Sequence, residues 1–327
     1  MRDVALEICG KARELLSEGK VRRVIGWERS PRTGLPIPCV ITRPEDAGRL
    51  TFGPLCAHPP TTYLSRDGAV HPTAIVARAC DTRAIVVQLQ ENDLRREDVF
   101  VIAVGCDGVA DTAKIEERLG RPWSTVTEVT SGNGSVTVTT DVGEAELRVP
   151  DDLLDRCTAC PVPQPVIEDM RIGEFPEAPP RRDDPLAAEV AELEAMSRDE
   201  RRAFFGAAFA RCIRCYACRN VCPICSCERC TADETQPQWI PRSTLGSENE
   251  LFLTLRAMHM AGRCTFCGAC ARACTMDVPL MVLNTKLAQE VERMFGHIAG
   301  TDPDAQPPMW QFEKTDPELP GHGGEAR

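Results

Sequence analysis

The chain has 327 residues, of which 43% are hydrophobic and 27% are charged, and its formal charge is -11. This composition predicts a soluble globular protein of about two domains and excludes a disordered or fibrous chain. The acidic balance argues against nucleic acid as a partner, because neutralising phosphates needs clustered lysine and arginine.

The sequence shows neither the apolar run of a membrane span nor the pattern of a signal peptide. No stretch approaches the roughly 18 consecutive apolar residues of a membrane span, and Met1 to Leu16 mixes charged with apolar residues, unlike a signal peptide. We therefore expect a cytoplasmic protein without a membrane span. In that reducing compartment, the 18 cysteines are expected to be metal ligands or redox groups more often than disulfides.

The first half of the chain has an α/β pattern. Apolar spacing predicts, in chain order, a helix over 4–16, a strand over 21–27, a strand over 74–79, a helix over 82–90 and a strand over 99–105. Two β-branched runs, 125–130 and 135–140, flank Asn133 and Gly134. This turn pair accepts positive φ, so the pattern predicts a hairpin.

A composition change predicts the domain boundary. The proline-rich segment RIGEFPEAPPRRDDP begins at Arg171 and reads as an extended linker. Beyond it, helices are predicted over 185–210, 250–260 and 280–295. The expected fold is an α/β domain followed by a mainly α-helical domain, divided into 1–172, a linker at 173–186, a helical domain at 187–300 and a tail at 301–327.

Two cysteine runs in the second half share the spacing C-x2-C-x2-C-x3-C, which holds cubane iron–sulfur clusters. They comprise Cys212, Cys215, Cys218 and Cys222, followed by a proline, and Cys264, Cys267, Cys270 and Cys274, followed by Thr275. Two-cluster ferredoxins cross their ligands, so that the fourth cysteine of each run serves the other cluster. That rule predicts one cluster on Cys212, Cys215, Cys218 and Cys274 and a second on Cys264, Cys267, Cys270 and Cys222.

Zinc is the alternative for these runs, but structural zinc sites take two separated pairs of ligands, which fits four cysteines in one short run poorly. Between the runs, the segment CPICSCERC carries Cys225, Cys227 and Cys230, which the ferredoxin pattern does not require. Three thiolates so close together favour a metal role, which could be zinc, part of another cluster or a metal of a partner, and the spacing does not choose among these.

A second set of cysteines lies in the first half. Cys80 and Cys106 each follow a predicted strand, at the end where open α/β sheets place their sites, and Cys157 and Cys160 form a C-x2-C pair. Four thiolates from three loops can surround one metal centre. On spacing alone, the favoured interpretation is four buried cysteines that act as small hydrophobic residues.

At these residues the sequence resembles a known family, the flavin-containing β subunits of deazaflavin-coenzyme-reducing hydrogenases and formate dehydrogenases, here fused to a two-cluster ferredoxin module. The resemblance rests on ARACDTRAIVVQLQENDLRREDVFVIAVGCDG and RCTACPVPQPVIEDMRIG in the first half, and on RCIRCYACRNVCPICSCERC, HMAGRCTFCGACARAC and FGHIAG in the second. It covers most of the chain from about Ala74 to Gly300.

The resemblance implies more than the spacing does. It implies a third cubane cluster on Cys80, Cys106, Cys157 and Cys160, and an FAD beside it. The residues that would approach the flavin are Asp81, Thr82, Arg83, Asp107 and Gly108, for which turn and helix-cap chemistry is the alternative interpretation. The chain has no G-x-G-x-x-G fingerprint, so FAD is implied by the resemblance alone.

These observations predict an iron–sulfur flavoprotein subunit that passes electrons between FAD and clusters within a larger complex. Expected partners are a formate dehydrogenase or hydrogenase catalytic subunit, a heterodisulfide-reductase-like subunit, ferredoxin or a deazaflavin coenzyme. The alternatives are a flavin-free electron relay and, from another class, a zinc-stabilised interaction protein. No hydrolytic or phosphoryl-transfer motif occurs, and the catalytic residues stay unassigned.

Overall fold

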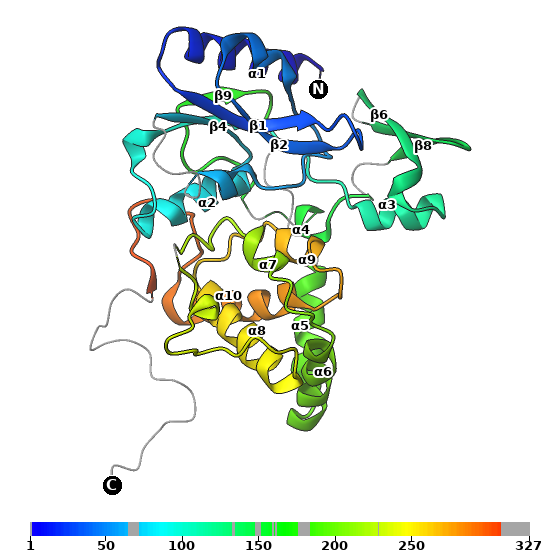
Figure 1. Ribbon diagram of the computed structural model, residues 1–327, viewed down its shortest axis with the longest axis vertical. Coiled ribbons are helices and arrows are strands. Elements are labelled where there is room, and N and C mark those ends of the chain that lie inside the picture. Colours follow the sequence, from blue (N-terminus) through cyan, green and yellow to red (C-terminus); the bar gives the residue numbers. More distant parts are fainter. Residues whose placement is uncertain are drawn as a thin grey trace.

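The computed structural model describes residues 2–64, 72–132, 135–147, 152–158, 160, 162–175, 184–227 and 229–308. An α/β half formed by the N-terminal residues lies against a helical half formed by the C-terminal residues (Figure 1). Within the described ranges, no helix is long and apolar enough to cross a bilayer.

A mostly parallel sheet forms the centre of the first half. Its strand order is β2-β1-β4-β5-β9. Strands β1, β4, β5 and β9 run parallel to one another in this order, whereas β2 and β3 pair antiparallel with β1. The bounds are β1 (Arg23–Arg29), β2 (Pro36–Ile41), β3 (Leu50–Thr51), β4 (Thr73–Ala77), β5 (Val99–Val104) and β9 (Met170–Ile172). Every residue of β4 is buried, because a parallel sheet is covered on both faces.

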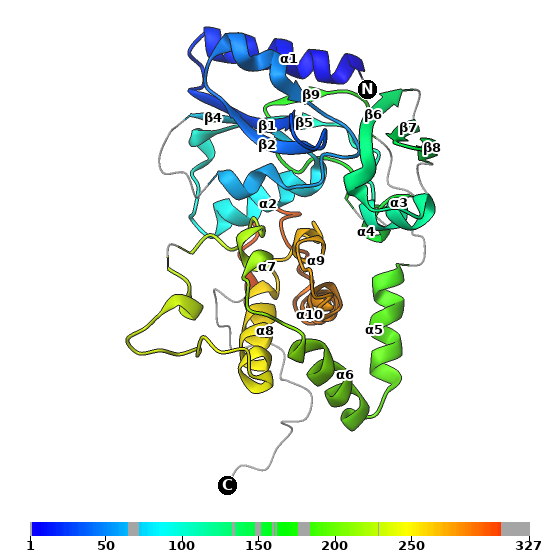
Figure 2. The same cartoon turned by 45° about the vertical axis from the view of Figure 1, so that its right-hand side comes forward.

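One helix covers each face of this sheet. Helix α1 (Arg2–Ser17) packs Ile8 and Leu15 into a core with Trp27, whereas α2 (Ala79–Gln90) packs Ile85 against Ile75 on the opposite face. In Figures 1 and 2, α2 lies between the sheet and the helical half. The predicted helices and strands of this region are therefore confirmed, with α2 beginning three residues earlier than predicted.

A smaller antiparallel sheet stands beside the main one (Figure 1). It contains β6 (Val126–Gly132), β7 (Ser135–Thr140) and β8 (Gly143–Leu147). The two predicted hairpin strands are confirmed, and their turn pair lies outside the described residues. Helix α3 (Thr112–Leu119) precedes this sheet, and the Asp111 side chain caps it by accepting from the Ala113 N–H at 3.0 Å.

Helices dominate the second half. Their bounds are α5 (Pro185–Ala195), α6 (Arg198–Ala210), α7 (Ala217–Asn220), α8 (Gly246–Met260), α9 (Ala269–Arg272) and α10 (Leu280–Phe295). The helix predicted over 185–210 is two helices. The break lies at Ser197, whose hydroxyl accepts from the Glu200 N–H while the Glu200 carboxylate accepts from the Ser197 N–H, a capping box that begins a new helix.

Short elements complete the description. The 3-10 helices are η1 (Pro44–Arg49), η2 (Pro60–Tyr63), η3 (Arg96–Asp98), η4 (Trp123–Thr125) and η5 (Thr231–Asp233), and α4 (Asp155–Thr158) is a single turn. The predicted linker ends earlier than expected, since α5 already begins at Pro185, and residues 176–183 lie outside the described ranges.

The first residues of the predicted tail contact the first half of the chain. The Gln90 side-chain amide donates to the carbonyls of Asp302 at 2.9 Å and Ala305 at 2.7 Å. Residues 309–327 lie outside the described part of the chain.

Helix α2 carries several of the contacts between the two halves. The Arg83 guanidinium donates to the Ala299 carbonyl at 2.8 and 3.0 Å, and the Gln88 amide donates to the Pro223 carbonyl at 2.6 Å. Ala84 and Val87 of the same helix pack in one apolar cluster with Cys222, Ile224, Met260 and Ala299. Polar and apolar contacts together fix how the helical half sits under the sheet.

Candidate metal centres

The two ferredoxin-type runs adopt the same local backbone. Arg214 and Phe266 occupy equivalent positions with φ of 57° and 59°, and Tyr216 and Gly268 follow equivalently with φ of 60° and 66°. In each loop these left-handed residues alternate with residues of negative φ, and alternation of this kind can form a concave backbone site for anions and iron–sulfur centres. Three non-glycine residues accept a left-handed conformation here, which indicates that the cysteine spacing dictates the loop shape.

The structure groups the eight cysteines of these runs into two sets that exchange their last members. The first set lines one small pocket and consists of Cys212, Cys215, Cys218 and Cys274. Burial raises the pKa of the Cys218 thiol, and the neighbouring charges of Cys212, Cys274 and Cys215 raise it further. Cys274, from the second run, therefore lies among three cysteines of the first.

The second set combines three cysteines of the second run with one cysteine of the first run. Burial raises the pKa of Cys264 to about 12, and the charges of Cys267 and Cys222 add to the shift. Burial likewise raises the pKa of Cys270, which also senses Cys264, Cys267 and Cys222. We call Cys212, Cys215, Cys218 and Cys274 the outer set, and Cys264, Cys267, Cys270 and Cys222 the middle set.

The cysteines predicted in the first half come together at one edge of the main sheet. Strands β4 and β5 are parallel neighbours with Ala77 opposite Ala103, so the chain leaves both strands at the same edge, where Cys80 opens α2 and Cys106 follows β5. Burial raises the pKa of Cys106 to about 12, with contributions from Cys80 and Cys157.

Hydrogen bonds to sulfur shape this third group. The Gly108 N–H donates to the Cys106 sulfur and the Val109 N–H donates to the Cys157 sulfur, both at 3.4 Å. Cys160 interacts with this group through Cys157. We call Cys80, Cys106, Cys157 and Cys160 the sheet-edge set, of which the first three lie near one another and the fourth adjoins Cys157.

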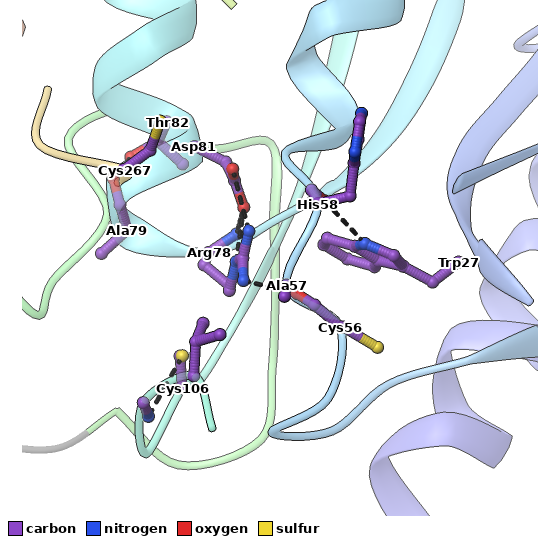
Figure 3. A network of polar contacts seen from close by, with 12 residues as sticks. Trp27, Cys56, Ala57, His58, Arg78, Ala79, Asp81, Thr82, Cys106 and Cys267 are labelled. Carbon is purple, nitrogen blue, oxygen red and sulfur yellow. Dashed lines mark hydrogen bonds and ion pairs between the residues drawn. The ribbon is translucent and has the colours of Figure 1, made fainter. Parts of the chain in front are cut away.

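A buried ion pair supports the sheet-edge set (Figure 3). Arg78 and Asp81 are 3% and 1% exposed, and the guanidinium donates to the carboxylate at 2.8 Å. Arg78 also donates to the Cys56 carbonyl at 2.6 Å and stacks 5.1 Å from the Trp27 ring. Removing either partner of such a pair would leave an uncompensated buried charge, so the network fixes the start of α2 and hence Cys80.

Arginines join the three sets. Arg156 donates to the Phe266 carbonyl at 2.9 Å, and its charge interacts with Cys157 and Cys80 of the sheet-edge set and with Cys267 of the middle set. Arg256 donates to the Cys218 carbonyl at 2.9 Å, and its charge interacts with both the middle and the outer set. The order is therefore sheet edge, Arg156, middle set, Arg256, outer set.

Several buried donors beside these sets have no acceptor in the described structure. They are Nε of Arg156, Nε of Arg214 and the Thr265 hydroxyl. A buried donor left unpaired costs about 1–3 kcal/mol, and cluster sulfides and thiolates are the acceptors that would remove this cost. The donor sets and the loop backbones fit iron–sulfur clusters.

Among the described residues, no group of three or more Cys, His, Asp or Glu side chains is placed to hold a single metal ion.

The residues proposed to approach a flavin are mostly engaged elsewhere. Asp81 pairs with Arg78, the Thr82 hydroxyl donates to the Ala79 carbonyl at 2.8 Å, and Arg83 holds Ala299. All three side chains are at least 97% buried. Asp107 is exposed beside Cys106, and Gly108 next to it has φ of 119°.

Sequence patterns did not indicate the joining arginines. Arg256 lies on α8 among apolar residues, and its role depends on which face of the helix meets the cysteine sets. Arg156 is adjacent to Cys157, but its contact with Phe266 spans 110 residues. The three cysteines outside the ferredoxin pattern, Cys225, Cys227 and Cys230, line one cavity beside α8.

Comparisons with known proteins agree with this organisation. The profile of a 4Fe-4S dicluster domain family matches residues 198–279, which contain both ferredoxin-type runs. The F420-dependent formate dehydrogenase subunit beta of Methanocaldococcus jannaschii is 33% identical over 107 residues, which is 32% of this chain and 27% of that protein. The chain thus spans about a quarter of that relative's length.

A second relative extends the similarity along the chain. The F420-dependent formate dehydrogenase 1 subunit beta of Methanococcus maripaludis is 23% identical over 358 aligned positions, covering 90% of each protein. A chain of the F420-reducing [NiFe] hydrogenase complex of Methanosarcina barkeri is 18% identical with a TM-score of 0.34, over 46% of this chain and 54% of that one. The chain is therefore similar to beta subunits of F420-dependent formate dehydrogenases, and its C-terminal half contains the match to a 4Fe-4S dicluster domain.

Proposed function

We propose that the chain is an iron–sulfur electron-transfer subunit of an oxidoreductase complex. In this proposal the sheet-edge, middle and outer sets each bind one [4Fe-4S] cluster, with the crossed ligands that the sequence predicts. The clusters, when bound, supply one-electron chemistry. The protein holds them in series and sets their potentials.

The observation that carries this proposal is the continuous order of thiol sets and arginines across the two halves. Arg156 touches the middle set's loop at Phe266 and senses the sheet-edge thiols, so the boundary between the halves falls between two cluster sites. Arg272 reinforces this boundary by donating to the Ala57 carbonyl at 2.7 Å. Electrons entering one half would then have a relay into the other.

The chain's own residues have defined tasks in this relay. In the first run the Arg214 N–H donates to the Cys212 sulfur at 3.4 Å, and Cys222 and Cys270 of the middle set are buried away from water. Burial also raises the pKa of Cys80 to about 11 and of Cys264 to about 12. Because cluster ligands must be thiolates, assembly at these sites would release protons.

The named relatives indicate the class of complex. They are beta subunits of formate dehydrogenases that use F420. We therefore propose a formate dehydrogenase or hydrogenase catalytic subunit as the partner, and a deazaflavin coenzyme as one terminus of the electron path. A heterodisulfide-reductase-like subunit and ferredoxin remain predictions that no observation on this chain favours.

FAD stays a prediction carried by the family resemblance. Three of the five flavin candidates are committed to internal contacts, which supports the helix-cap interpretation of Asp81 and leaves Asp107 and Gly108 as the residues able to approach a flavin. Flavin analysis of the purified protein decides between the flavoprotein and the flavin-free relay.

The experiment is a matched set of variants in the full chain, purified without oxygen. Cys215→Ser, Cys267→Ser and Cys80→Ser should each lose about four iron atoms, one cubane's worth. The control Cys39→Ser alters a buried cysteine, 7% exposed, in the apolar core of the first half, and should keep its iron. Unchanged iron in the three variants, or zinc in place of iron, would contradict the proposal.

A further inference from the structure

The segment between α7 and α8 places its three extra cysteines on one cavity. In Figure 2 this segment extends outward beside α8. The cavity has a volume of about 300 Å³ and is lined by Cys225, Cys227 and Cys230. Cys227 is exposed at the surface, whereas the other two are half-buried. None of the three belongs to the sheet-edge, middle or outer set.

Arginines make this cavity suited to an anion. Arg256 lines it and is 6% exposed, and its Nε and Nη1 have no acceptor in the described structure. Arg219 lines it as well and shares a side-chain hydrogen bond with Cys230. A buried guanidinium with two unused donors is costly unless a negatively charged group accepts from it.

The cavity is wide enough for a polyatomic group, since its volume is about 300 Å³. His259 lines the same cavity and offers a ligand beyond the three thiols, whereas Asp233, which also lines it, is paired with Arg219 at 2.7 Å. Three thiolates, a further donor and a cationic wall match the chemistry of an iron–sulfur cluster.

We propose that this cavity holds an additional anionic iron–sulfur cluster, with Cys225, Cys227 and Cys230 as thiolate ligands and Arg219 and Arg256 as counter-charges. Cys225 lies beside Cys222 of the middle set, and its N–H donates to the Cys222 carbonyl at 3.3 Å, so the site adjoins the relay. Exposed Cys227 places it at the surface. It is the point where a redox partner exchanges electrons with the chain.

This proposal goes beyond the proposed function, which uses none of the three cysteines. The test compares full-length chain with Cys227→Ser and Cys230→Ser, all purified without oxygen, for iron, sulfide and zinc. Cys227 is exposed, and surface substitutions usually change stability by no more than about 0.5 kcal/mol, so its variant should fold. Cys9→Ser, a buried cysteine in the core of the first half, is the control.

Loss of about four iron and four sulfide atoms in both variants, with the control unchanged, is the expected result. Unchanged iron would overturn the proposal, and loss of zinc without iron would replace the cluster by a zinc site. Electron paramagnetic resonance of the reduced proteins separates this test from the proposed function. The signals of the middle and outer clusters should persist in both variants, and their absence from the unmodified chain would instead refute the proposed function.

Discussion

The two halves of the molecule assemble their cysteine sets in different ways. In the helical half, each set takes three cysteines from one short loop and one from the other run, so the local spacing fixes most of the geometry. In the α/β half, the sheet-edge set draws on residues from Cys80 to Cys160, and only the pairing of β4 with β5 brings the first two together. The second kind of site depends on the whole fold.

The difference teaches where each site is vulnerable. A ferredoxin-type loop keeps its ligand arrangement as long as its own backbone is intact. The sheet-edge set also needs the buried Arg78–Asp81 pair, the strand register and the anchoring of Cys157 near Val109. Changes remote from any cysteine should therefore damage the sheet-edge set more than the other two.

The largest effect is expected from Cys267→Ser, because the middle set lies between the other two. It should lose about four iron atoms, destabilise the helical half, since cluster binding is coupled to folding, and stop electron transfer between the sheet-edge and outer clusters. Cys80→Ser should lose as much iron and leave both ferredoxin-type signals. Iron analysis with redox titration measures both variants. Loss of both ferredoxin-type signals in Cys80→Ser would show that the sheet-edge site is not independent of the ferredoxin-type sites.

The next effect concerns the support of the sheet-edge set. Asp81→Asn removes one charge of a buried pair and should lower the free energy of unfolding by about 3–5 kcal/mol. Asp98→Asn is the matched control, because Arg95 and Asp98 form the same i,i+3 pair with the arginine 69% exposed. Its cost should be at most about 1 kcal/mol. Denaturant unfolding measures both, and equal costs would contradict the structural role given to Arg78.

A smaller effect tests the contact between the halves. Gly300 has φ of 68°, and a Cβ there would lie 2.3 Å from the Arg83 carbonyl oxygen. Gly296 has φ of 63° with nothing within 4 Å, so Gly296→Ala should cost only the left-handed penalty of about 1–2 kcal/mol. Gly300→Ala should cost more and expose the interface to protease. Identical melting temperatures for the two variants would count against the tight fit at Arg83.

The smallest effect separates the two buried arginines of the helical half, which are both 6% exposed. Arg256→Gln should lower the reduction potentials of the middle and outer clusters, because its charge interacts with Cys222, Cys270 and Cys218. Arg214→Gln should lower only the outer potential, since Arg214 acts on Cys212. Shifts on the order of tens of millivolts are expected. If Arg256→Gln shifted the reduction potential of the outer cluster alone, Arg256 would not link the middle and outer clusters.

Sequence patterns predicted much of this molecule. The spacing of apolar residues gave α1, β1, β4, β5 and α10 because a helix or buried strand imposes its own period. The grouping of Cys274 with the outer set follows from the ferredoxin spacing for the same local reason. The break at Ser197 could have been found as well, since Ser197 and Glu200 form a capping box readable from sequence.

Other features depend on tertiary contacts that no local pattern encodes. Strand β9 is only three residues long and exists because β5 offers it an edge. The packing of residues 301–308 depends on Gln90, more than 200 residues earlier in the chain. The family resemblance places Asp81 near a flavin. In the structure the Asp81 carboxylate is instead paired with Arg78, three residues earlier in the chain. A buried pair of this kind becomes evident only when burial is known.

The central claim is that the α/β half carries its own cluster in series with the ferredoxin-type pair. The most direct measurement is anomalous diffraction at the iron edge from crystals of the anaerobically purified full chain. The account predicts an iron cluster among Cys80, Cys106, Cys157 and Cys160, beside Arg156, and separate clusters at the middle and outer sets. Iron confined to the helical half, with no iron at the sheet edge, would contradict it.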